Sequence, residues 1–424
     1  MTDLFTPAIR RRLTYTLFAA HTLFMAAQIA AFTLMSIIGV QLSGSDATAG
    51  IPSTISMIGR ALAGYPIGWL MDRWGRRAGL TFGYLLGVLG GVIALLAIGQ
   101  ASLVGFCLGV GLAGMTRGAS EQTRFIAAEA ELPDRRAKAI GFVVAGGTIA
   151  AVGGPLLVEP ASALVTRYGL SLFTGPYLLS ALLSLLSMVV VFGWLRPEPL
   201  QVGRAIESAY GVATHSKADE AHHNAGRTLL QVLVHPQVRL ALTALLVSQF
   251  VMTFLMVIMP VHMNHHDLST GAISWVISMH SLGMYVVSPF TGWLVDRVGR
   301  IKVVVLGALT LTLSALLTAV SPTFIPILAA MFLVGLGWNF AFIAGSSLLS
   351  DALSQHERGR IQGASETITA LAGGVGSLTS GIIFSLGDAV GLSIIGTLAS
   401  LLLLLAVLAW GRTETIMPVA QYES

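Results

Sequence analysis

The chain has 424 residues, of which 54% are hydrophobic and only 10% are charged, and its mean hydropathy is +0.79. A soluble protein of this composition would have to bury nearly all of its helices on every side, and a transmembrane β-barrel would show short alternating segments instead of long apolar runs. The formal net charge of +4 does not indicate nucleic-acid binding, because most basic residues fall in loops on one side of the predicted membrane spans. Composition therefore predicts an all-α polytopic membrane protein.

Apolar runs of about 20 residues, the length that crosses the hydrocarbon core of a bilayer, recur along the chain. The first six predicted spans cover residues 13–40, 50–71, 79–99, 102–123, 139–162 and 170–195, and six more cover 238–260, 271–294, 302–320, 325–349, 363–386 and 391–411. We therefore predict twelve transmembrane helices in a 6+6 arrangement. It divides the chain into an N-terminal six-helix bundle at 1–195, a cytoplasmic linker at 196–237 and a C-terminal six-helix bundle at 238–424.

The basic residues predict the orientation of the chain in the membrane. With an even number of spans both termini lie on one side, and the loops of that side hold all lysines and arginines except Arg60, Arg117, Arg124 and Arg167. Because positively charged loops stay in the cytoplasm, we expect both termini to be cytoplasmic and the protein to lie in the cytoplasmic (inner) membrane. Arg60 falls near the middle of the second span, where a charge is costly unless it faces a cavity or a partner, so it is a candidate cavity residue.

An internal repeat relates the two halves. The segment GWLMDRWGR at residues 68–76 recurs as GWLVDRVGR at residues 292–300, each time after the second span of its half. Glycine permits a tight turn and aspartate accepts charge-assisted hydrogen bonds, so we expect a gating element made of Gly68, Asp72, Arg73, Gly75, Arg76, Gly292, Asp296, Arg297, Gly299 and Arg300. This motif, present in both halves, strongly resembles the signature of the major facilitator superfamily. The resemblance covers nearly the whole chain and implies a secondary transporter with that family's fold.

Two pairs of metal-ligating side chains lie on the seventh and eighth spans. Met252 and Met256 are four residues apart, as are His280 and Met284, so each pair shares one helix face. On adjacent antiparallel helices the two pairs would form one site. Thioether sulfur combined with imidazole nitrogen suits Cu(I) better than hard cations or zinc, so these residue types favour copper. The corresponding positions of the N-terminal half carry no such ligands. This difference between the halves indicates that the four residues bind the substrate and are not part of the shared scaffold.

The connection after the seventh span adds residues for possible external metal capture, namely His262, Met263, His265 and His266. The two paired motifs, Met-x-x-x-Met in the seventh span and His-x-x-x-Met in the eighth, resemble those of the CcoA-type copper importers, the branch of the superfamily that supplies copper for cytochrome oxidase assembly. This resemblance implies import of copper, as Cu(I), as the transported substrate, with no tightly bound cofactor. It also leaves room for a cytoplasmic copper acceptor as a partner, in addition to the lipid bilayer.

Two alternatives remain open at the level of sequence. Relatives in the same branch import riboflavin, and aromatic and amide side chains of the C-terminal half could bind such a molecule: Trp275, Tyr285, Trp338, Asn339 and Phe340. A non-transporting membrane sensor or assembly factor is the more remote alternative, because the chain shows neither a soluble domain nor a second motif set outside the spans. The chain is not expected to be an enzyme, since no catalytic constellation occupies a common predicted pocket.

Overall fold

The computed structural model describes residues 6–132, 135–210, 235–353 and 355–411, and the described chain is almost entirely helical. The first half contains α1 (Pro7–Thr33), α2 (Met35–Ser43), the 3-10 turn η2 (Asp46–Thr48), α3 (Ile51–Trp74), α4 (Arg76–Gly99), α5 (Leu103–Ser120), α6 (Thr123–Glu129), α7 (Arg136–Leu156), α8 (Val158–Arg167), the 3-10 turn η4 (Leu172–Thr174) and α9 (Gly175–Trp194). After α10 (Pro199–Tyr210), the second half contains α13 (Pro236–His265), α14 (Thr270–Tyr285), α15 (Ser288–Val298), α16 (Arg300–Thr318), α17 (Phe324–Asp351) and α18 (Gln355–Trp410).

These helices make twelve membrane crossings. Within the described ranges, ten continuous helical stretches are long and apolar enough to cross a bilayer. Helix α3, whose hydropathy is lowered by Arg60 and by serine and threonine residues, adds one more. Helix α18 crosses twice, because the backbone at Asp388 takes a φ of 50° and reverses the chain between its two arms. The twelve-helix 6+6 fold expected from the sequence is therefore confirmed.

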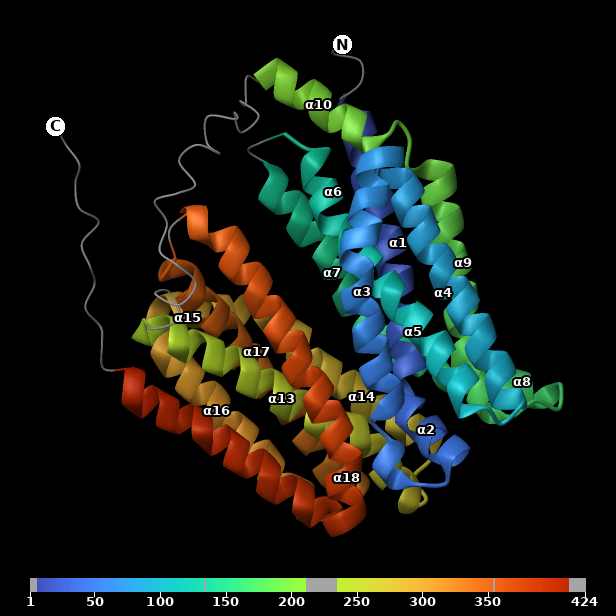
Figure 1. Ribbon diagram of the computed structural model, residues 1–424, viewed down its shortest axis with the longest axis vertical. Helices are drawn as coiled ribbons and strands as arrows, with labels where there is room; N and C mark the ends of the chain where they lie inside the picture. The colour runs from blue at the N-terminus through green and yellow to red at the C-terminus, as the bar shows by residue number, and fades with distance from the viewer. Residues whose placement is uncertain (1–5, 133–134, 211–234, 354, 412–424) are drawn as a thin grey trace.

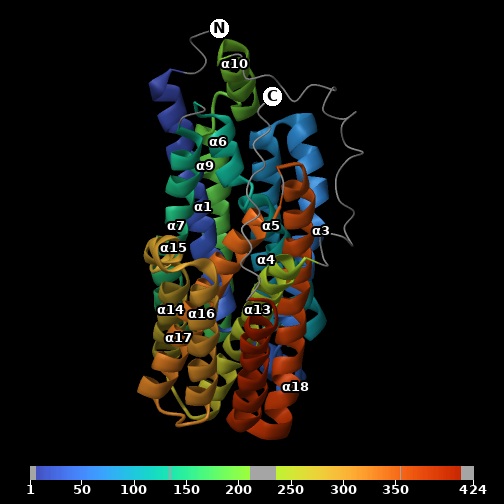
Figure 2. The ribbon, with the colours of Figure 1, turned by 90° about the vertical axis from the view of Figure 1, so that its left-hand side faces the viewer.

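The two bundles meet at one end of the molecule and diverge toward the other (Figure 1). We call the first end the η2 end, since it holds η2 and the α13–α14 connection, and the other the linker end, since it holds α10 and the α3–α4 turn. Contacts between the bundles join α7 to α14, α3 and η2 to α18, and α2 to α13. The view turned by 90° shows the helices of both bundles running roughly between these two ends (Figure 2).

Hydrogen bonds near the η2 end tie the bundles together. The hydroxyl of Ser377 on α18 donates to the carbonyl of Gly50 (2.9 Å) and also pairs with Ser53, while the hydroxyl of Thr54 donates to the carbonyl of Gly374 (3.3 Å). Such close backbone approach requires small residues, and serine, threonine and glycine supply them at this seam. In this conformation the molecule is therefore closed at the η2 end.

Close helix packing makes the internal repeat visible in three dimensions. In the first half, a Cβ added at Gly114 on α5 would lie 2.0 Å from the carbonyl oxygen of Ser56 on α3. In the second half, a Cβ added at Gly335 on α17 would lie 2.2 Å from the carbonyl oxygen of His280 on α14. The two halves thus use a glycine at the same contact, and the structure equates Ser56 with His280.

The segment between the halves is partly described. Helix α10 lies across the linker end of the first bundle and buries Val202 and Ile206 in the core of that bundle. Residues 211–234, the larger part of the expected linker, lie outside the described residues. The boundaries of the linker at 196 and 237 therefore stay predictions.

Candidate functional site

The four expected copper ligands lie in the interior of the second half. Met252 on α13 and Met284 on α14 are 7% and 8% exposed, and His280 on α14 is 0% exposed. Met252 and Met284 belong to one buried apolar cluster, and the partly buried Met256 packs against it. The sulfur atoms thus lie in dry, apolar surroundings, where a soft cation meets little competition from water.

His280 has one nitrogen engaged and one without a partner. Its Nδ1 lies 3.1 Å from the carbonyl oxygen of Met331 on α17. Because a carbonyl only accepts, Nδ1 donates the hydrogen, and Nε2 presents a lone pair. This Nε2 is buried and has no hydrogen-bond partner among the described residues. Buried polar atoms normally find a partner, and a metal-ligating histidine commonly donates its other N–H to a backbone carbonyl.

The direct packing expected between the two ligand helices is wrong. Helix α17 packs against both α13 and α14, whereas these two helices scarcely contact each other. The reason is the close approach of Gly335 to His280, which draws α14 onto α17. Within the described ranges, no three His, Cys, Asp or Glu side chains are grouped to hold a metal ion. A metal site here would therefore depend on the thioether sulfurs.

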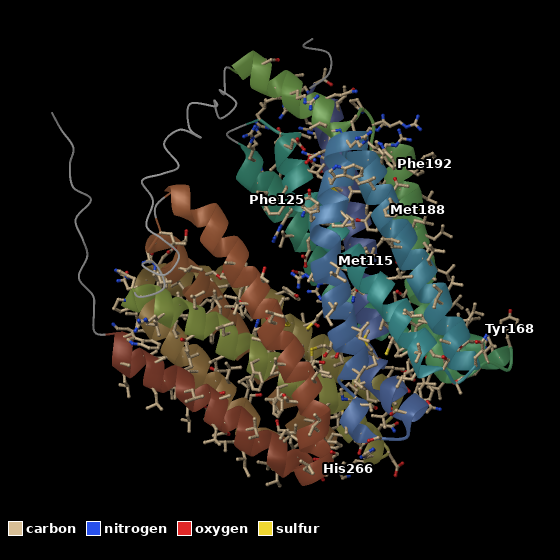
Figure 3. The ribbon with its side chains drawn as sticks, viewed as in Figure 1. Met115, Phe125, Tyr168, Met188, Phe192 and His266 are labelled. Atoms are coloured by element: carbon tan, nitrogen blue, oxygen red, sulfur yellow. The ribbon has the colours of Figure 1, made fainter. Side chains whose placement is uncertain are left out.

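Three of the residues expected to capture metal outside the membrane, His262, Met263 and His265, are helical, because α13 continues to His265 where the sequence suggested a loop. His266 follows directly after the helix. His262 is buried, with its Nδ1 3.5 Å from Asp388, and its ring lies 4.8 Å from that of His266. His266 is exposed and lies at the η2 end (Figure 3). His265 pairs with Asp46 of the other bundle at 3.4 Å. Met263, by contrast, is 0% exposed in the core, so it faces away from any external mouth.

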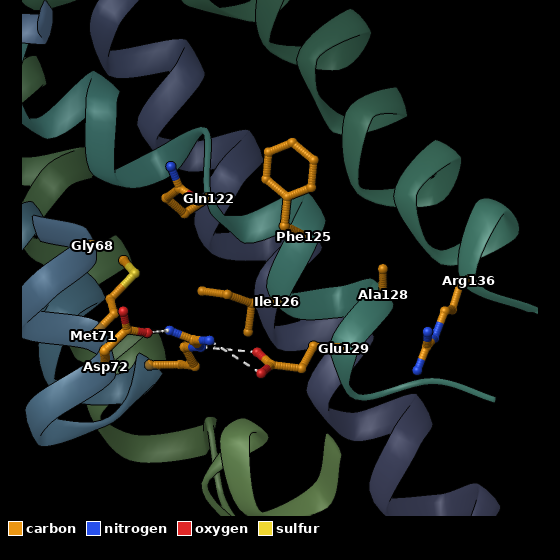
Figure 4. A pocket seen from close by; sticks show the side chains of 10 residues that line it. Gly68, Met71, Asp72, Gln122, Phe125, Ile126, Ala128, Glu129 and Arg136 are labelled. Carbon is orange, nitrogen blue, oxygen red and sulfur yellow. Dashed lines mark hydrogen bonds and ion pairs between the residues drawn. The ribbon is translucent and has the colours of Figure 1, made fainter. Parts of the chain in front are cut away.

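The first copy of the gating motif forms a charged network at the linker end. Gly75 ends α3 with a φ of 97°, and the guanidinium of Arg76 binds Asp72 at 2.6 Å and Glu129 at 2.9 and 3.1 Å (Figure 4). The carboxylate of Glu198, just before α10, accepts from the backbone nitrogen of Arg76 at 2.5 Å. This network borders a cavity of about 480 Å3 lined by Gly68, Met71, Asp72, Arg76, Gln122, Phe125, Ile126, Ala128, Glu129 and Arg136.

The second copy of the motif repeats part of this geometry among the described residues. Gly299 has a φ of 96°, and Arg300 pairs with Asp351 at the end of α17 at 2.5 Å. Arg297 stacks over Trp293, as Arg73 stacks over Trp69. Gly292 and Asp296 lie within α15, and Asp296 is exposed. Positive φ angles account for the glycine at the end of each copy of the motif, Gly75 and Gly299.

Arg60 belongs to an ion-pair cluster that sequence reasoning did not assemble. Its Nε and Nη2 lie 3.1 and 2.9 Å from the two carboxylate oxygens of Glu121, and Arg117 donates to the same carboxylate at 3.3 Å. The four-residue spacing between Arg117 and Glu121 was a local signal for part of this cluster. The contact with Arg60, on another helix, had no local signal.

Aromatic side chains near the ligand helices are only partly available to a substrate. The indole of Trp338 donates to Gln249 at 3.1 Å and stacks on Phe342 with 4.6 Å between ring centroids. Asn339 is buried and donates to the Met284 carbonyl and to Ser288, so it ties α17 to α14. Phe340 is buried in the core, while Tyr285 is partly buried and Trp275 is exposed. Gln249 was not expected from the sequence.

Comparisons with known proteins agree on the class of the chain. Its sequence matches the Major Facilitator Superfamily over residues 17–271 and 241–421. It is 33% identical over 388 residues to the uncharacterized MFS-type transporter YdeG of Bacillus subtilis (90% of this chain, 88% of the relative) and 32% identical over 338 residues to the riboflavin transporter RfnT of Brucella anthropi (79% and 80%).

Solved structures show the same fold. A bacterial homolog of the human lysosomal transporter Spinster, in an inward-facing and occupied conformation, superposes with a TM-score of 0.71 at 16% identity and covers 96% of this chain and 97% of its own. A D-xylose-proton symporter also gives 0.71, at 17% identity with 92% and 96% covered. With the sequence match spanning both halves, the chain belongs to the major facilitator superfamily and is a membrane transporter, not an enzyme.

Proposed function

We propose that this transporter imports copper, as Cu(I), across the cytoplasmic membrane by alternating access, with Met252, Met256, His280 and Met284 as the ligands that pass the ion. The observation that carries the proposal is the buried His280. Its Nδ1 is held by a backbone carbonyl and its Nε2 has no partner in the described chain, four residues from Met284. Imidazole and thioether together are ligands suited to Cu(I).

Neutral ligands also suit transfer of the ion. Because none of the four ligands carries a charge, the positive charge of Cu(I) stays uncompensated by them, which favours release over storage. The bundles touch at the η2 end and diverge toward the linker end (Figure 1), as in a transporter open on one side. With both termini and α10 on the cytoplasmic side, this conformation delivers the ion inward, for use in cytochrome oxidase assembly or by a cytoplasmic acceptor.

The experiment is uptake of radioactive copper by cells that express the chain. We expect His280→Ala, and the combined change of Met252, Met256 and Met284 to Leu, to abolish the transporter-dependent uptake. Met259→Leu is the matched control, because Met259 is 0% exposed in the same cluster on α13 but is not a proposed ligand. Methionine and leucine have similar volumes, so the fold should tolerate these changes. Undiminished copper uptake by the ligand variants contradicts the proposal.

Riboflavin, or a similar planar organic molecule, is the second candidate substrate. It is favoured by the resemblance to RfnT over most of the chain and by the stacked pair of Trp338 and Phe342, which lies beside the amide of Gln249. Aromatic stacking with a neighbouring amide is a suitable surface for a flat heterocycle. Uptake of labelled riboflavin that is lost in Trp338→Leu and retained in His280→Ala would favour this candidate over copper.

A further inference from the structure

Two neighbouring residues of α17 bind different helices, α13 and α14, which carry the proposed ligands. The indole nitrogen of Trp338 donates to the side-chain oxygen of Gln249 on α13 at 3.1 Å. The side-chain nitrogen of the next residue, Asn339, donates to the backbone carbonyl of Met284 on α14 at 2.6 Å. Because α13 and α14 each pack on α17 and scarcely on each other, these hydrogen bonds connect the two ligand helices through a third one.

The hydrogen bond on α13 lies on the face that carries the methionine pair. Gln249 precedes Met252 by three residues and Met256 by seven, and residues at these spacings share one helix face. The amide of Gln249 is itself oriented, since its nitrogen donates to the hydroxyl of Thr253 at 3.1 Å. Trp338 thus binds α13 at the face of its proposed ligands.

The hydrogen bonds on α14 lie at a break in the helix beside the proposed ligand Met284. Helix α14 ends at Tyr285 and α15 begins at Ser288, and the amide of Asn339 spans this break. Besides donating to the Met284 carbonyl, the amide donates to the hydroxyl of Ser288 at 2.7 Å and accepts from the hydroxyl of Thr291. Asn339 is 1% exposed, so water does not compete for these bonds, and they fix the backbone at Met284.

The internal repeat shows that the fold does not require the amide at this place. The close contact of α5 with α3, and that of α17 with α14, set the correspondence between the halves. In this register Gly118 on α5 takes the place of Asn339. A Cβ added at Gly118 would lie 3.1 Å from the carbonyl oxygen of Arg60, which takes the place of Met284. The first bundle thus makes the same contact without a side chain, and its helix α3 continues without a break.

A metal ion is bound tightly only when all of its ligands reach it together, and residues that orient the ligands typically change metal affinity by about 10- to 100-fold. The two ligand helices scarcely touch each other, so α17 determines their separation. We propose that Trp338 and Asn339 are positioning residues, which set the distance of the methionine pair on α13 from His280 and Met284 on α14. This role rests on the proposed copper transport.

The first test measures the Cu(I) affinity of the purified full-length protein in lipid nanodiscs, by competition with a chromogenic Cu(I) chelator in the absence of oxygen. Trp338→Phe removes the donor to Gln249 and keeps an aromatic ring, while Gln249→Leu removes the acceptor of the same hydrogen bond. Each should lower the affinity by about 10- to 100-fold, as should Asn339→Leu. A loss in Trp338→Phe with none in Gln249→Leu overturns the role of this bond. If Trp338→Phe does not fold, Gln249→Leu decides alone.

Ser314→Ala is the matched control. The buried hydroxyl of Ser314 on α16 donates to the carbonyl of Ala330 on α17 at 2.7 Å, so its removal also costs α17 a hydrogen bond to another helix. This bond joins α17 to neither ligand helix. We expect Ser314→Ala to lower the thermal unfolding midpoint about as much as Trp338→Phe does and to keep the Cu(I) affinity of the wild type. An equal loss of affinity in the control overturns the proposal, because it shows general loosening of the bundle.

Double-mutant cycles show through which ligands each residue acts. In a background with Met252 and Met256 changed to Leu, Trp338→Phe should cause no further loss of Cu(I) affinity. Asn339→Leu should still lower the affinity there. In a Met284→Leu background the pattern should reverse. A merely structural role predicts the same fold-change in every background, and that result overturns the proposal.

Copper binding itself separates this proposal from the proposed function. Cu(I) binding that is lost in His280→Ala but unchanged in the three positioning variants supports the copper function and overturns the positioning role. If the wild type binds no Cu(I), or if His280→Ala binds it as tightly as the wild type, the copper function is overturned and the positioning role with it.

Discussion

Closure of the η2 end depends on the absence of a side chain at Gly50. A Cβ added at this position would lie 1.7 Å from the carbonyl oxygen of Ser377 on α18, while ordinary contact begins near 3.4 Å. In Gly50→Ala the helices α3 and α18 therefore have to separate locally by about 1.7 Å. The separation weakens the hydrogen bond from Ser377 to Gly50 and the bond from Thr54 to Gly374.

The expected effect is a shift of population away from the conformation closed at the η2 end. Overpacking typically costs about 1–3 kcal/mol, and each hydrogen bond contributes about 1 kcal/mol. Loss of about half of each of the two hydrogen bonds brings the total to about 2–4 kcal/mol. This shifts the equilibrium between the two conformations by roughly 30- to 700-fold, since 1.4 kcal/mol is tenfold. Substrate uptake should fall, because a transporter that cannot close one side completes few cycles.

Distances between spin labels at the η2 end test this directly. Cysteines replace the exposed Ser45 of the first bundle and Asn264 at the end of α13, in a Cys107→Ser background. We expect a longer label-to-label distance in Gly50→Ala than in the parent protein. Gly64→Ala is the matched control, because it lies on the same helix and no atom lies within 4 Å of its added Cβ. An unchanged distance distribution in Gly50→Ala would refute the steric reasoning.

Three further predictions concern stability, each measured as the thermal unfolding midpoint of the purified protein. Gly299→Ala should destabilise the protein by about 1–2 kcal/mol, because a residue with a Cβ is strained at the φ of 96° found there. Gly292→Ala should be nearly neutral, because no atom lies within 4 Å of its added Cβ. Equal effects of the two substitutions would contradict the role of backbone strain. Asn339→Leu should destabilise the protein by about 1–3 kcal/mol, since it removes the hydrogen bonds that Asn339 donates to the Met284 carbonyl and to Ser288, and an unchanged midpoint would argue against that role. Asp46→Asn should change the free energy of unfolding by less than about 1 kcal/mol, because the side chain of its partner His265 is 43% exposed and exposed ion pairs contribute little to stability. A larger loss of stability would contradict this expectation.

The fold could be predicted because its signals are local and repeated. Apolar runs long enough for a bilayer give the spans, and two copies of one nine-residue motif relate the halves. The break at Asp388 inside α18 falls between the predicted spans at 363–386 and 391–411, so the two arms of α18 are these two spans. Gly387 directly precedes the break and is a local signal for the turn.

The candidate site could be predicted only in part, because periodicity tells which face a residue occupies and not which helix that face meets. Met252 and Met256 were assigned to one face of α13 and His280 to the opposing helix, but α13 and α14 each pack on α17 and scarcely on each other. The reason lies in Gly335, whose missing side chain lets α17 approach His280. The pairing of Arg60 with Glu121 was hidden for the same reason, since it joins residues that are distant in sequence.

The environment of His280 also bears on the choice between the two candidate substrates. The imidazole is completely buried against α17, with Nδ1 bound to the Met331 carbonyl. A flavin has no access to this imidazole in the present conformation, because the side chain is completely buried. A single ion needs only the space of one atom beside Nε2. If riboflavin is the cargo, the buried Nε2 without a partner destabilises the protein and has no function. If copper is the cargo, Nε2 is a ligand, and the hydrogen bond from Nδ1 to the Met331 carbonyl fixes the direction of its lone pair.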